Sequence, residues 1–400
     1  MKAYILKSNK TIEPFGDHPR DCLIVNKPLS IHQQEALQSQ NISMVTISDQ
    51  EQIQDTDEYL VFGDYLYFTP ELLNEFISRS RSLRCRTVAA LKPGITTLRC
   101  MAATQSVDKH EDYIGYCLSY IPGEENRQGD TQTIVIDTDQ FSEFVPVSKH
   151  MSGDTEYRVP LTDRLLIQIE HWTSLWGANI GTLLTGMYRV KNRPKLSLLW
   201  LALKARSFNQ WNVLHHVNKF GKGCDIHPTA YIEGSTIGNG VKIGAMAIVR
   251  ESVVGDNSYI ANNAAVELSV IGEGSCLQGG VVVQYSVLYP GSFTFAKSIN
   301  TSFMGKNSFM AGAASLSDFR FDGKSVTVIK DGEKVDTGNT FLGACLGHGA
   351  YLGSGCIVAP GRTIPNGMRI NPENSRIISK CSAEQEIEGY QRTIVQPQDS

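Results

Sequence analysis

Two residues of types that commonly transfer protons stand in the C-terminal third of the sequence. His348 is the only histidine of the glycine-rich tract from 341 to 370, where it lies at the turn of Gly-His-Gly, and Lys297 lies in Ser-Phe-Thr-Phe-Ala-Lys-Ser. A histidine exchanges protons near neutral pH, whereas a lysine does so only if its pKa is strongly lowered. We take both as candidate catalytic residues. For His348 the alternative is a solvent-exposed residue at the corner of a repeat.

A charged segment interrupts the repeats between residues 315 and 340. Its sequence Val-Thr-Val-Ile-Lys-Asp-Gly-Glu-Lys-Val predicts two strands joined by an Asp-Gly turn, and thus a projecting hairpin. Loops that project from repeat scaffolds commonly hold binding groups. The segment also contains Arg320, Phe321, Asp322 and Lys324, which we take as candidate substrate-binding residues. The alternative is a hairpin without a binding role.

Further charged candidates stand in the N-terminal part. Asp64 follows the apolar run Tyr-Leu-Val-Phe-Gly, and a carboxylate at the C-terminal end of a strand is well placed to bind a ligand in an open α/β sheet. Lys10 and Arg20 could contact the phosphates of a nucleotide. The alternative for both is an ordinary solvated side chain.

A seventeen-residue repeat must position the C-terminal candidates. Ser235, Ser252, Ser269 and Ser286 stand seventeen apart with apolar residues in step, and a second tract from Phe341 reads in sixes. Fixed periods of this kind indicate a solenoid whose rungs bury their aliphatic residues against one another. The spacing predicts a parallel β-helix of roughly seven rungs from about residue 224 to about residue 370.

The N-terminal candidates stand in a different pattern. Apolar runs at 3–7 and 57–69 predict buried strands, and 30–40 and 69–80 predict helices, the second with Thr69 as N-cap. This alternation is typical of an α/β layered domain. Residues 96–107 and 112–121 alternate more like antiparallel strands.

Residues 161–220 predict two or three helices, with a break at Pro194. The second helix carries Lys195, Lys204 and Arg206 around a face of leucine and tryptophan, so it could lie on a membrane surface. The alternative is packing against the first rungs of the solenoid or between subunits.

Composition narrows the class of protein. The 400 residues include 37 basic and 41 acidic side chains, a balance that does not suggest a nucleic-acid partner. The sequence predicts no signal peptide and no spanning helix, so we expect a cytoplasmic protein. The nine cysteines include no C-x-x-C pair, and we expect them to be reduced and mostly buried.

The interrupted repeat resembles a known family. The stretches AGAASLSDFRFDGKSVTV and KVDTGNTFLGACLGHGAYLGSGCIVAPG resemble the C-terminal domain of bifunctional sugar-1-phosphate nucleotidylyltransferase/acetyltransferases of the glucosamine-1-phosphate acetyltransferase type. The resemblance implies a left-handed β-helix, a homotrimer, and binding of a sugar phosphate and acetyl-CoA or another acyl-CoA beside Phe321 to Lys324. The family's catalytic histidine falls near Phe295 to Lys297, where this sequence has none.

The N-terminal part resembles the nucleotidyltransferase domain of sugar-nucleotide pyrophosphorylases. Over PFGDHPRDCLIVNKPLSIHQQEAL the resemblance puts Arg20 at the family's signature lysine, and over LVFGDYLYFTPELLNEFI it puts Asp64 at the carboxylate that holds Mg²⁺. The family's glycine-rich phosphate loop is replaced by LKSNKTIEP. We therefore expect this domain to have the fold but not the activity.

These observations predict an α/β N-terminal nucleotidyltransferase-like domain (1–155), a helical connector (156–222), a left-handed parallel β-helix of hexapeptide repeats (223–372, hairpin 315–340) and a tail (373–400). We expect acyl-CoA-dependent acyl transfer to a sugar phosphate or nucleotide sugar at the β-helix. The alternatives are a noncatalytic regulatory or ligand-binding homologue, and a Mg²⁺-dependent nucleotidyltransferase with an unusual phosphate loop.

Overall fold

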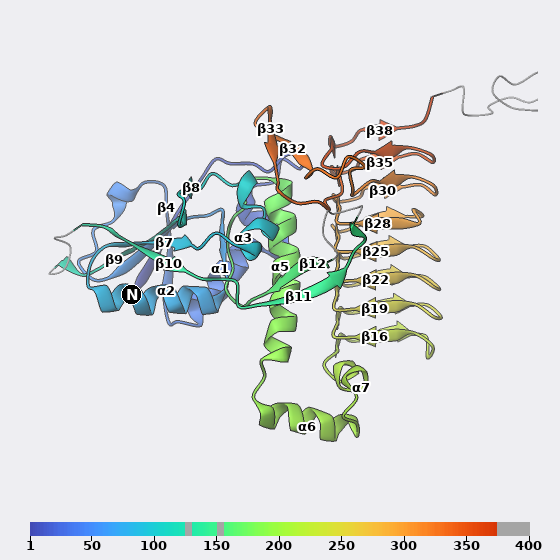
Figure 1. Cartoon of the computed structure of the whole chain (residues 1–400), viewed down its shortest axis with the longest axis horizontal. Helices are drawn as coiled ribbons and strands as arrows, with labels where there is room; N and C mark the ends of the chain where they lie inside the picture. Colours follow the sequence, from blue (N-terminus) through green and yellow to red (C-terminus); the bar gives the residue numbers. More distant parts are fainter. Residues whose placement is uncertain (125–129, 150–155, 374–400) are drawn as a thin grey trace, which may run out of the picture.

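The computed structural model describes residues 1–124, 130–149 and 156–373. An α/β domain stands on one side, a β-helix stands on the other, and one long helix runs between them (Figure 1). The predicted order of α/β domain, helical connector and β-helix is confirmed, while the exact domain boundaries stay predictions and the predicted tail, beyond residue 373, lies outside the described residues.

A seven-stranded mixed sheet forms the α/β domain. Its main path runs β10-β7-β9-β5-β1-β4, with β8 (Asp108–Lys109) paired to β9. Helix α2 begins at Pro70, with Thr69 as its N-cap as predicted, and ends at Leu83. The other elements are β1 (Lys2–Leu6), α1 (Leu29–Gln38), β4 (Ser43–Ile47), β5 (Tyr59–Gly63), β7 (Thr87–Leu91), β9 (Ile114–Ile121) and β10 (Gln132–Ile136).

The two segments predicted as antiparallel strands differ in outcome. Residues 112–121 contain β9, which pairs antiparallel with β5 and β7, so that prediction is confirmed. The strand prediction for 96–107 is wrong, because α3 (Ile95–Arg99) and a 3-10 turn (Ala102–Thr104) occupy it. The Asp139 carboxylate accepts the backbone N–H groups of Ile95 and Thr96, both at 2.8 Å, and stabilises this helix start. This cap comes from 43 and 44 residues away and has no local sequence signal.

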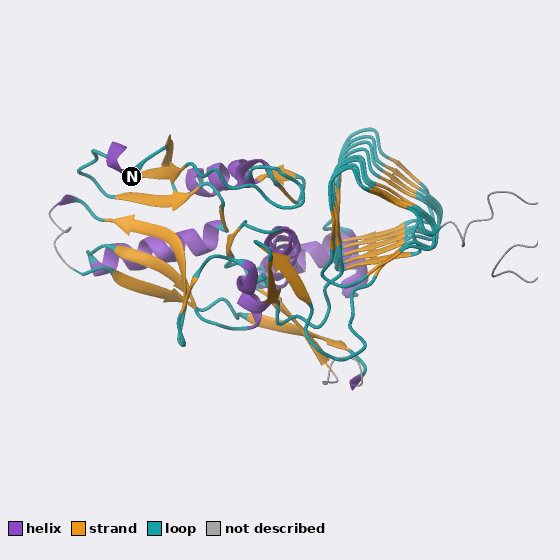
Figure 2. Cartoon of the chain, turned by 90° about the horizontal axis from the view of Figure 1, so that it is seen from above, coloured by secondary structure: helices purple, strands orange, loops and turns teal. Residues whose placement is uncertain are grey.

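The C-terminal part is a parallel β-helix with three faces, seen as a triangular coil from above (Figure 2). Two faces hold eight strands each and the third holds seven. The first strand is β14 (Lys219–Phe220). The predicted count of roughly seven rungs is one too low, since the face from β15 (Asp225–Ile226) to β38 (Arg369–Ile370) holds eight strands within the predicted bounds. The five strands of the 341–370 tract, β34 to β38, end at Leu346, Leu352, Val358, Ile364 and Ile370, as the six-residue period predicts.

The repeated serines form a buried ladder along one corner. The hydroxyl oxygen of Ser235 accepts the backbone N–H of Ser252 at 3.1 Å, and each later serine accepts from the next coil in the same way. Each hydroxyl also donates to a carbonyl in its own coil, as from Ser269 to Glu267 at 2.7 Å. A small side chain that both donates and accepts satisfies a corner where the backbone would otherwise be buried without partners.

The predicted hairpin is present as β32 (Thr327–Lys330) and β33 (Glu333–Asp336), which pair antiparallel. Only part of the hairpin projects into solvent. Val326 and Val328 are fully buried, and the hairpin lies beside the upper end of α5 (Figure 1). The hairpin is therefore part of the contact between the two domains.

The connector begins with strands. Residues Glu156–Leu161 form β12, which pairs with β11 (Phe141–Pro146), and Leu166–Gln168 form β13. The helices are α5 (Trp172–Lys191), α6 (Lys195–Ala205) and α7 (Gln210–His215), with Pro194 in the predicted break. Among the described residues, no helix is both long and apolar enough to cross a bilayer.

Helix α5 joins the domains through one hydrophobic core. Trp172 and Trp176 on α5 share this core with Tyr67 from the α/β domain and with Tyr289 and Phe303 from the β-helix. The Trp176 indole N–H donates to the carbonyl of Tyr285 at 2.7 Å, and the Asn179 side chain on α5 bonds the 23–25 turn. The two domains are thus held in a fixed relation.

Candidate functional site

Asp64 lies at the end of β5, where the strand prediction placed it. Its side chain is almost completely buried and accepts two hydrogen bonds from Ser8, from the backbone N–H at 3.1 Å and from the hydroxyl at 2.7 Å. His18 Nε2 lies 3.8 Å from the same carboxylate and donates to the carbonyl of Ser8 at 2.6 Å. The carboxylate therefore fixes the segment that replaces the glycine-rich loop.

The donors around Asp64 do not fit a magnesium site. Mg²⁺ requires several oxygen ligands in octahedral geometry, and it takes them from carboxylates, phosphates and water. Both Asp64 oxygens are engaged by Ser8, and the described part of the chain contains no group of three or more His, Cys, Asp or Glu arranged to hold a metal. The residues around Asp64 are therefore arranged to hold Ser8 and do not form a Mg²⁺ site.

Lys10 lies near Asp64 but is neutralised. It forms an ion pair with Glu170, and its Nζ lies 3.9 Å from the centre of the Tyr65 ring. The ammonium of Lys330, from the hairpin, lies 3.5 Å from the Glu170 carboxylate. Burial raises the pKa of Glu170, but hydrogen bonds from Lys10 and Ser106 outweigh it and lower the pKa below its ordinary value. Glu170 thus joins the α/β domain to the hairpin.

The sequence analysis missed Glu170. The sequence feature that could have identified Glu170 is its position: it directly follows the apolar run Leu-Leu-Ile-Gln-Ile and stands just before the start of a helix. Arg20 lies apart from this group in a 3-10 turn (Pro19–Asp21), where its Nε is 3.9 Å from Asp21.

His348 lies in the contact between the domains. Its Nδ1 accepts the backbone N–H of Lys306 at 2.8 Å, so the neutral ring carries its proton on Nε2, which donates to Asp17 at 3.1 Å. The ring stacks on Phe15 with 4.8 Å between centroids. Both ring nitrogens therefore have hydrogen-bond partners. The alternative of a solvent-exposed corner residue does not fit a ring that Phe15, Asp17 and Lys306 contact.

The binding candidates of the interrupting segment form a group on the surface. Arg320 and Asp322 pair with each other, with Arg320 Nε 2.9 Å from the carboxylate, and this guanidinium lowers the pKa of Asp322 to about 2. Gly323 takes φ +68°, a conformation that favours glycine, and this turns the chain between Asp322 and Lys324. Phe321 is 99% exposed.

Lys297 lies on a different part of the β-helix. Its side chain is exposed, and it follows Ala296, which is buried, and Phe295, which is half exposed. The structure thus brings Lys10 and Asp64 into one region and keeps Arg320 to Lys324 together. It does not join Lys297 or His348 to either group.

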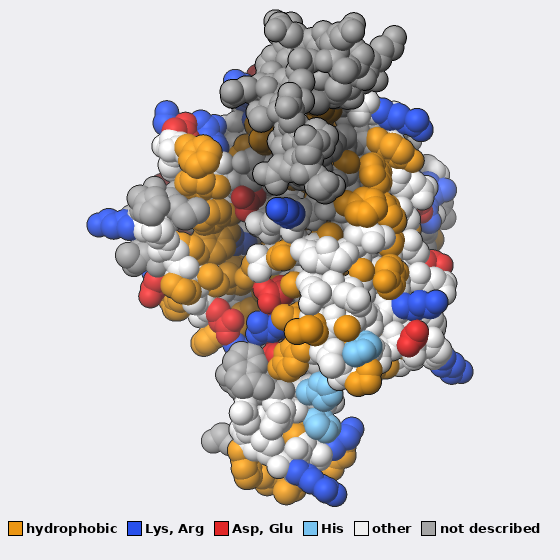
Figure 3. All heavy atoms as spheres, turned by 90° about the vertical axis from the view of Figure 1, so that its right-hand side faces the viewer, with side chains coloured by type: hydrophobic (Ala, Val, Ile, Leu, Met, Phe, Trp, Pro, Cys, Tyr) orange, Lys and Arg blue, Asp and Glu red, His pale blue; other side chains and the backbone are white. Residues whose placement is uncertain are grey.

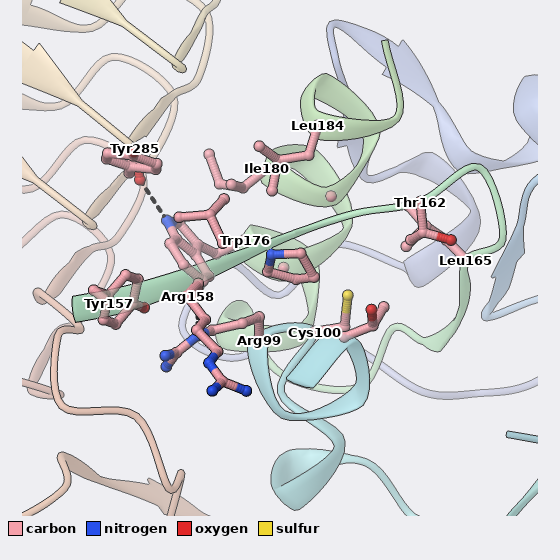
Figure 4. A pocket seen from close by; sticks show the side chains of 15 residues that line it. Arg99, Cys100, Tyr157, Arg158, Thr162, Leu165, Trp176, Ile180, Leu184 and Tyr285 are labelled. Atoms are coloured by element: carbon pink, nitrogen blue, oxygen red, sulfur yellow. Dashed lines mark hydrogen bonds between the residues drawn. The ribbon is translucent and has the colours of Figure 1, made fainter. Parts of the chain in front are cut away.

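Among the described residues, the hollows between the domains include two that bear on a ligand site. The first, of about 40 Å³, is lined by side chains of α5, β12 and the β-helix (Figure 4). It has room for about one water molecule and is too small for a sugar nucleotide.

The second hollow is a cleft of about 470 Å³, within the size range of small-molecule sites. Its walls are Glu13 and Pro14 from the N-terminal segment, His171 and Trp172 at the start of α5, Ile329 of the hairpin, and residues 361–365. Burial lowers the pKa of His171 to about 4, so this side of the cleft is neutral.

The fold and these sites define a protein in which an α/β domain is fixed to a parallel β-helix. Residues 212–309 match the family model described as GMPPB C-terminal domain. The match confirms the predicted resemblance to the sugar-1-phosphate nucleotidylyltransferase family over that part of the chain. No curated protein sequence matches the chain.

Solved structures that are similar to the chain include two that are described as transferases. A candidate acetyltransferase from Bacillus cereus shares 16% identity over 38% of this chain and 76% of its own length, with a TM-score of 0.18. The UDP-N-acetylglucosamine acyltransferase of Arabidopsis shares 15% identity over 38% of this chain and 60% of its own, with a TM-score of 0.25. This chain thus spans less than two thirds of the Arabidopsis protein.

Proposed function

We propose that the chain is a sugar-related transferase that binds an acyl-CoA and a sugar phosphate or nucleotide sugar at its β-helix. The observation that carries the proposal is the exposed group Arg320 to Lys324, in which Arg320 pairs with Asp322 and Gly323 turns the chain. The family match to the preceding rungs and the names of the similar acetyltransferase and acyltransferase structures support it.

The exposed group has the chemistry that a coenzyme A molecule requires. An aromatic ring or a guanidinium can stack on adenine, and cationic side chains bind its phosphates. Phe321 leaves its whole ring in solvent, while Lys324 is exposed beside it. A row of ring contacts from Phe321 through Phe319 and Phe341 to Tyr157 fixes the base of this group.

Acyl transfer also needs a group that accepts a proton from the hydroxyl or amine of the acceptor. In our proposal Lys297 and His348 are the two candidates. Lys297 is exposed, so a neighbouring subunit or a ligand would have to cover it before it could accept this proton. His348 would first have to release Asp17 or the Lys306 backbone N–H, so its geometry favours a positioning role.

The proposal includes a homotrimer. One outer face of the β-helix carries a column of aromatic side chains, and Figure 3 shows hydrophobic side chains gathered along this part of the molecule. Phe293 stacks on Phe309 with 5.8 Å between centroids, and Phe309 contacts Tyr351 at 5.5 Å. Packing this column against a second chain would bury it, as closed symmetric assemblies do.

A thermal-shift titration with acetyl-CoA and longer acyl-CoAs tests the proposal. A ligand at about 100 times its Kd should stabilise the protein by about 2.7 kcal/mol. We expect the shift to disappear in Phe321→Ala and Lys324→Ala, and to persist in Phe144→Ala, an exposed aromatic residue on β11 outside the group. No shift with any acyl-CoA, or an equal shift in all variants, would contradict the proposal.

A second candidate function is a noncatalytic binding or regulatory protein. The state of the α/β domain favours it, because Ser8 occupies Asp64 and Glu170 neutralises Lys10. The cleft of about 470 Å³ could hold its ligand. This candidate predicts binding of a nucleotide sugar without turnover and without dependence on Mg²⁺. Binding of a nucleoside triphosphate with Mg²⁺ that Asp64→Asn abolishes would instead support an active nucleotidyltransferase.

A further inference from the structure

Helix α6 leaves an apolar face uncovered. Leu196, Trp200 and Leu203 are 80%, 63% and 64% exposed, and Phe208, just beyond the helix, is 84% exposed. Leu196, Leu199, Trp200 and Leu203 follow the i, i+3, i+4, i+7 pattern of a single helical face. Leu201 and Ala202 are buried. The helix therefore has one covered side and one apolar side that no described residue of this chain covers.

The charged residues in the sequence around this face are all basic. No Asp or Glu occurs between Glu170 and Asp225, whereas eight Lys or Arg residues do. Two of these pair with carboxylates elsewhere, Arg189 with Glu71 and Lys191 with Glu143. Arg193, Lys204 and Arg206 are exposed beside the apolar face. The Lys204 ammonium lies 5.6 Å from the centre of the Trp200 ring, so charge and apolar surface are adjacent.

The placement of α6 suits a flat surface. Figure 1 shows α6 lying crosswise beyond the lower end of α5, with the α/β domain and nearly all of the β-helix on its other side. In Figure 3 hydrophobic side chains and Lys and Arg side chains lie together at this end of the molecule. A flat surface could thus contact α6 without meeting either domain.

We propose that α6 docks the protein on the surface of an anionic lipid membrane. The leucine and tryptophan side chains would enter the boundary between headgroups and acyl chains, and the flanking cations would pair with anionic headgroups. Charge favours this occupant over a second copy of the chain, because two copies of α6 would bring like charges together. An anionic lipid membrane offers negative headgroups for the cations of α6 and an apolar interior for its leucine and tryptophan side chains.

The proposal is tested by flotation of the full chain with vesicles. We expect binding to vesicles that contain about one third phosphatidylglycerol, and little binding to phosphatidylcholine alone. Trp200→Ser with Leu203→Ser should abolish binding, and Arg193→Glu with Lys204→Glu should weaken it on the order of tenfold or more. The matched controls are Met44→Ser, on β4, and the pair Lys109→Glu and Lys334→Glu, on β8 and the hairpin, which change exposed residues away from α6 and should bind as the parent does.

A second readout separates docking from misfolding and self-association. The Trp200 indole should shift its emission to shorter wavelength with anionic vesicles only, while melting temperature and sedimentation mass stay the same in all variants without lipid. Equal binding to neutral vesicles would overturn the proposal. So would unchanged binding of the Trp200 and Leu203 variant, or a fall in its oligomer mass without any vesicle binding by the parent protein.

Discussion

His348 on the β-helix donates a hydrogen bond to Asp17 of the α/β domain, with 3.1 Å between Nε2 and the carboxylate oxygen. Lys306 donates to the same oxygen at 2.6 Å. Burial raises the pKa of Asp17, but these two hydrogen bonds outweigh it and lower the pKa below its ordinary value. An ionised carboxylate thus holds the N-terminal segment against the solenoid.

Asp17→Asn should therefore destabilise the protein at neutral pH. A hydrogen bond to a charged group contributes about 1.5–3 kcal/mol, so we expect a loss of about 2 kcal/mol in the free energy of unfolding at pH 7. Because the folded pKa is lowered, this stabilisation is present above the unfolded pKa and is lost as pH falls through the folded value. Denaturant titration at several pH values should show the gap closing below about pH 4. Asp225→Asn, at an exposed residue, is the control and should change stability by less than about 0.5 kcal/mol.

His348→Ala separates a positioning role from a catalytic one. If His348 positions the domains, the variant should melt at lower temperature and keep its turnover number in an acyl-transfer assay at a temperature where it is folded. Lys297→Ala should then melt normally and lose turnover if Lys297 accepts the proton. A loss of 10²-fold or more in His348→Ala, with a normal melting temperature, would assign the proton transfer to His348 instead.

The buried His171 should make stability depend on mild acid. Its folded pKa is about 4, against about 6.5 in an unfolded chain, so protonation favours unfolding. The contribution of the neutral His171 ring to the free energy of unfolding amounts to about 3 kcal/mol. It is complete above pH 6.5 and is lost as the pH falls to about 4. His171→Asn keeps an acceptor for the Thr173 N–H and has no titrating ring. The slope of stability between pH 6.5 and 4 should be smaller in this variant, and an unchanged slope would refute the assignment.

The serine ladder should be sensitive to loss of one hydroxyl. Ser269→Ala leaves the buried N–H of Ser286 without its 3.0 Å acceptor, and an unsatisfied buried donor costs about 1–3 kcal/mol. Chemical denaturation measures this loss. Ser298→Ala, at an exposed position in the same solenoid, should be nearly neutral, and equal effects of both changes would contradict a special role for the ladder.

The β-helix could be predicted because its signals repeat. Every coil places Ile237, Val254, Ile271 and Leu288 or their equivalents in the same inward column, so one error at a single coil does not hide the pattern. The start of α2 was predicted for a similar reason, since Thr69 and Pro70 are adjacent signals. The helix at Ile95 was missed because its cap, Asp139, is distant in sequence.

The candidate residues were harder to place, because sequence shows the type of a side chain but not its partners. Lys10 and Asp64 lie in the same region, yet Glu170 pairs with Lys10 and Ser8 bonds to Asp64. The turn glycines around His348 suggested an exposed corner. Only the folded chain shows that Phe15 and Asp17, more than 300 residues away, cover that ring.

The shared core of the two domains has a consequence for synthesis on the ribosome. Val326, Val328, Leu342 and Cys345 complete a hydrophobic cluster that begins with Ile12 and Phe15. The α/β domain emerges first, so part of its side of this cluster stays uncovered until the last quarter of the chain has been translated. Domains generally fold in order during synthesis, and exposed apolar surface at this stage favours aggregation. The nascent chain therefore depends on its final coils, or on a chaperone until they arrive, to become a stable protein.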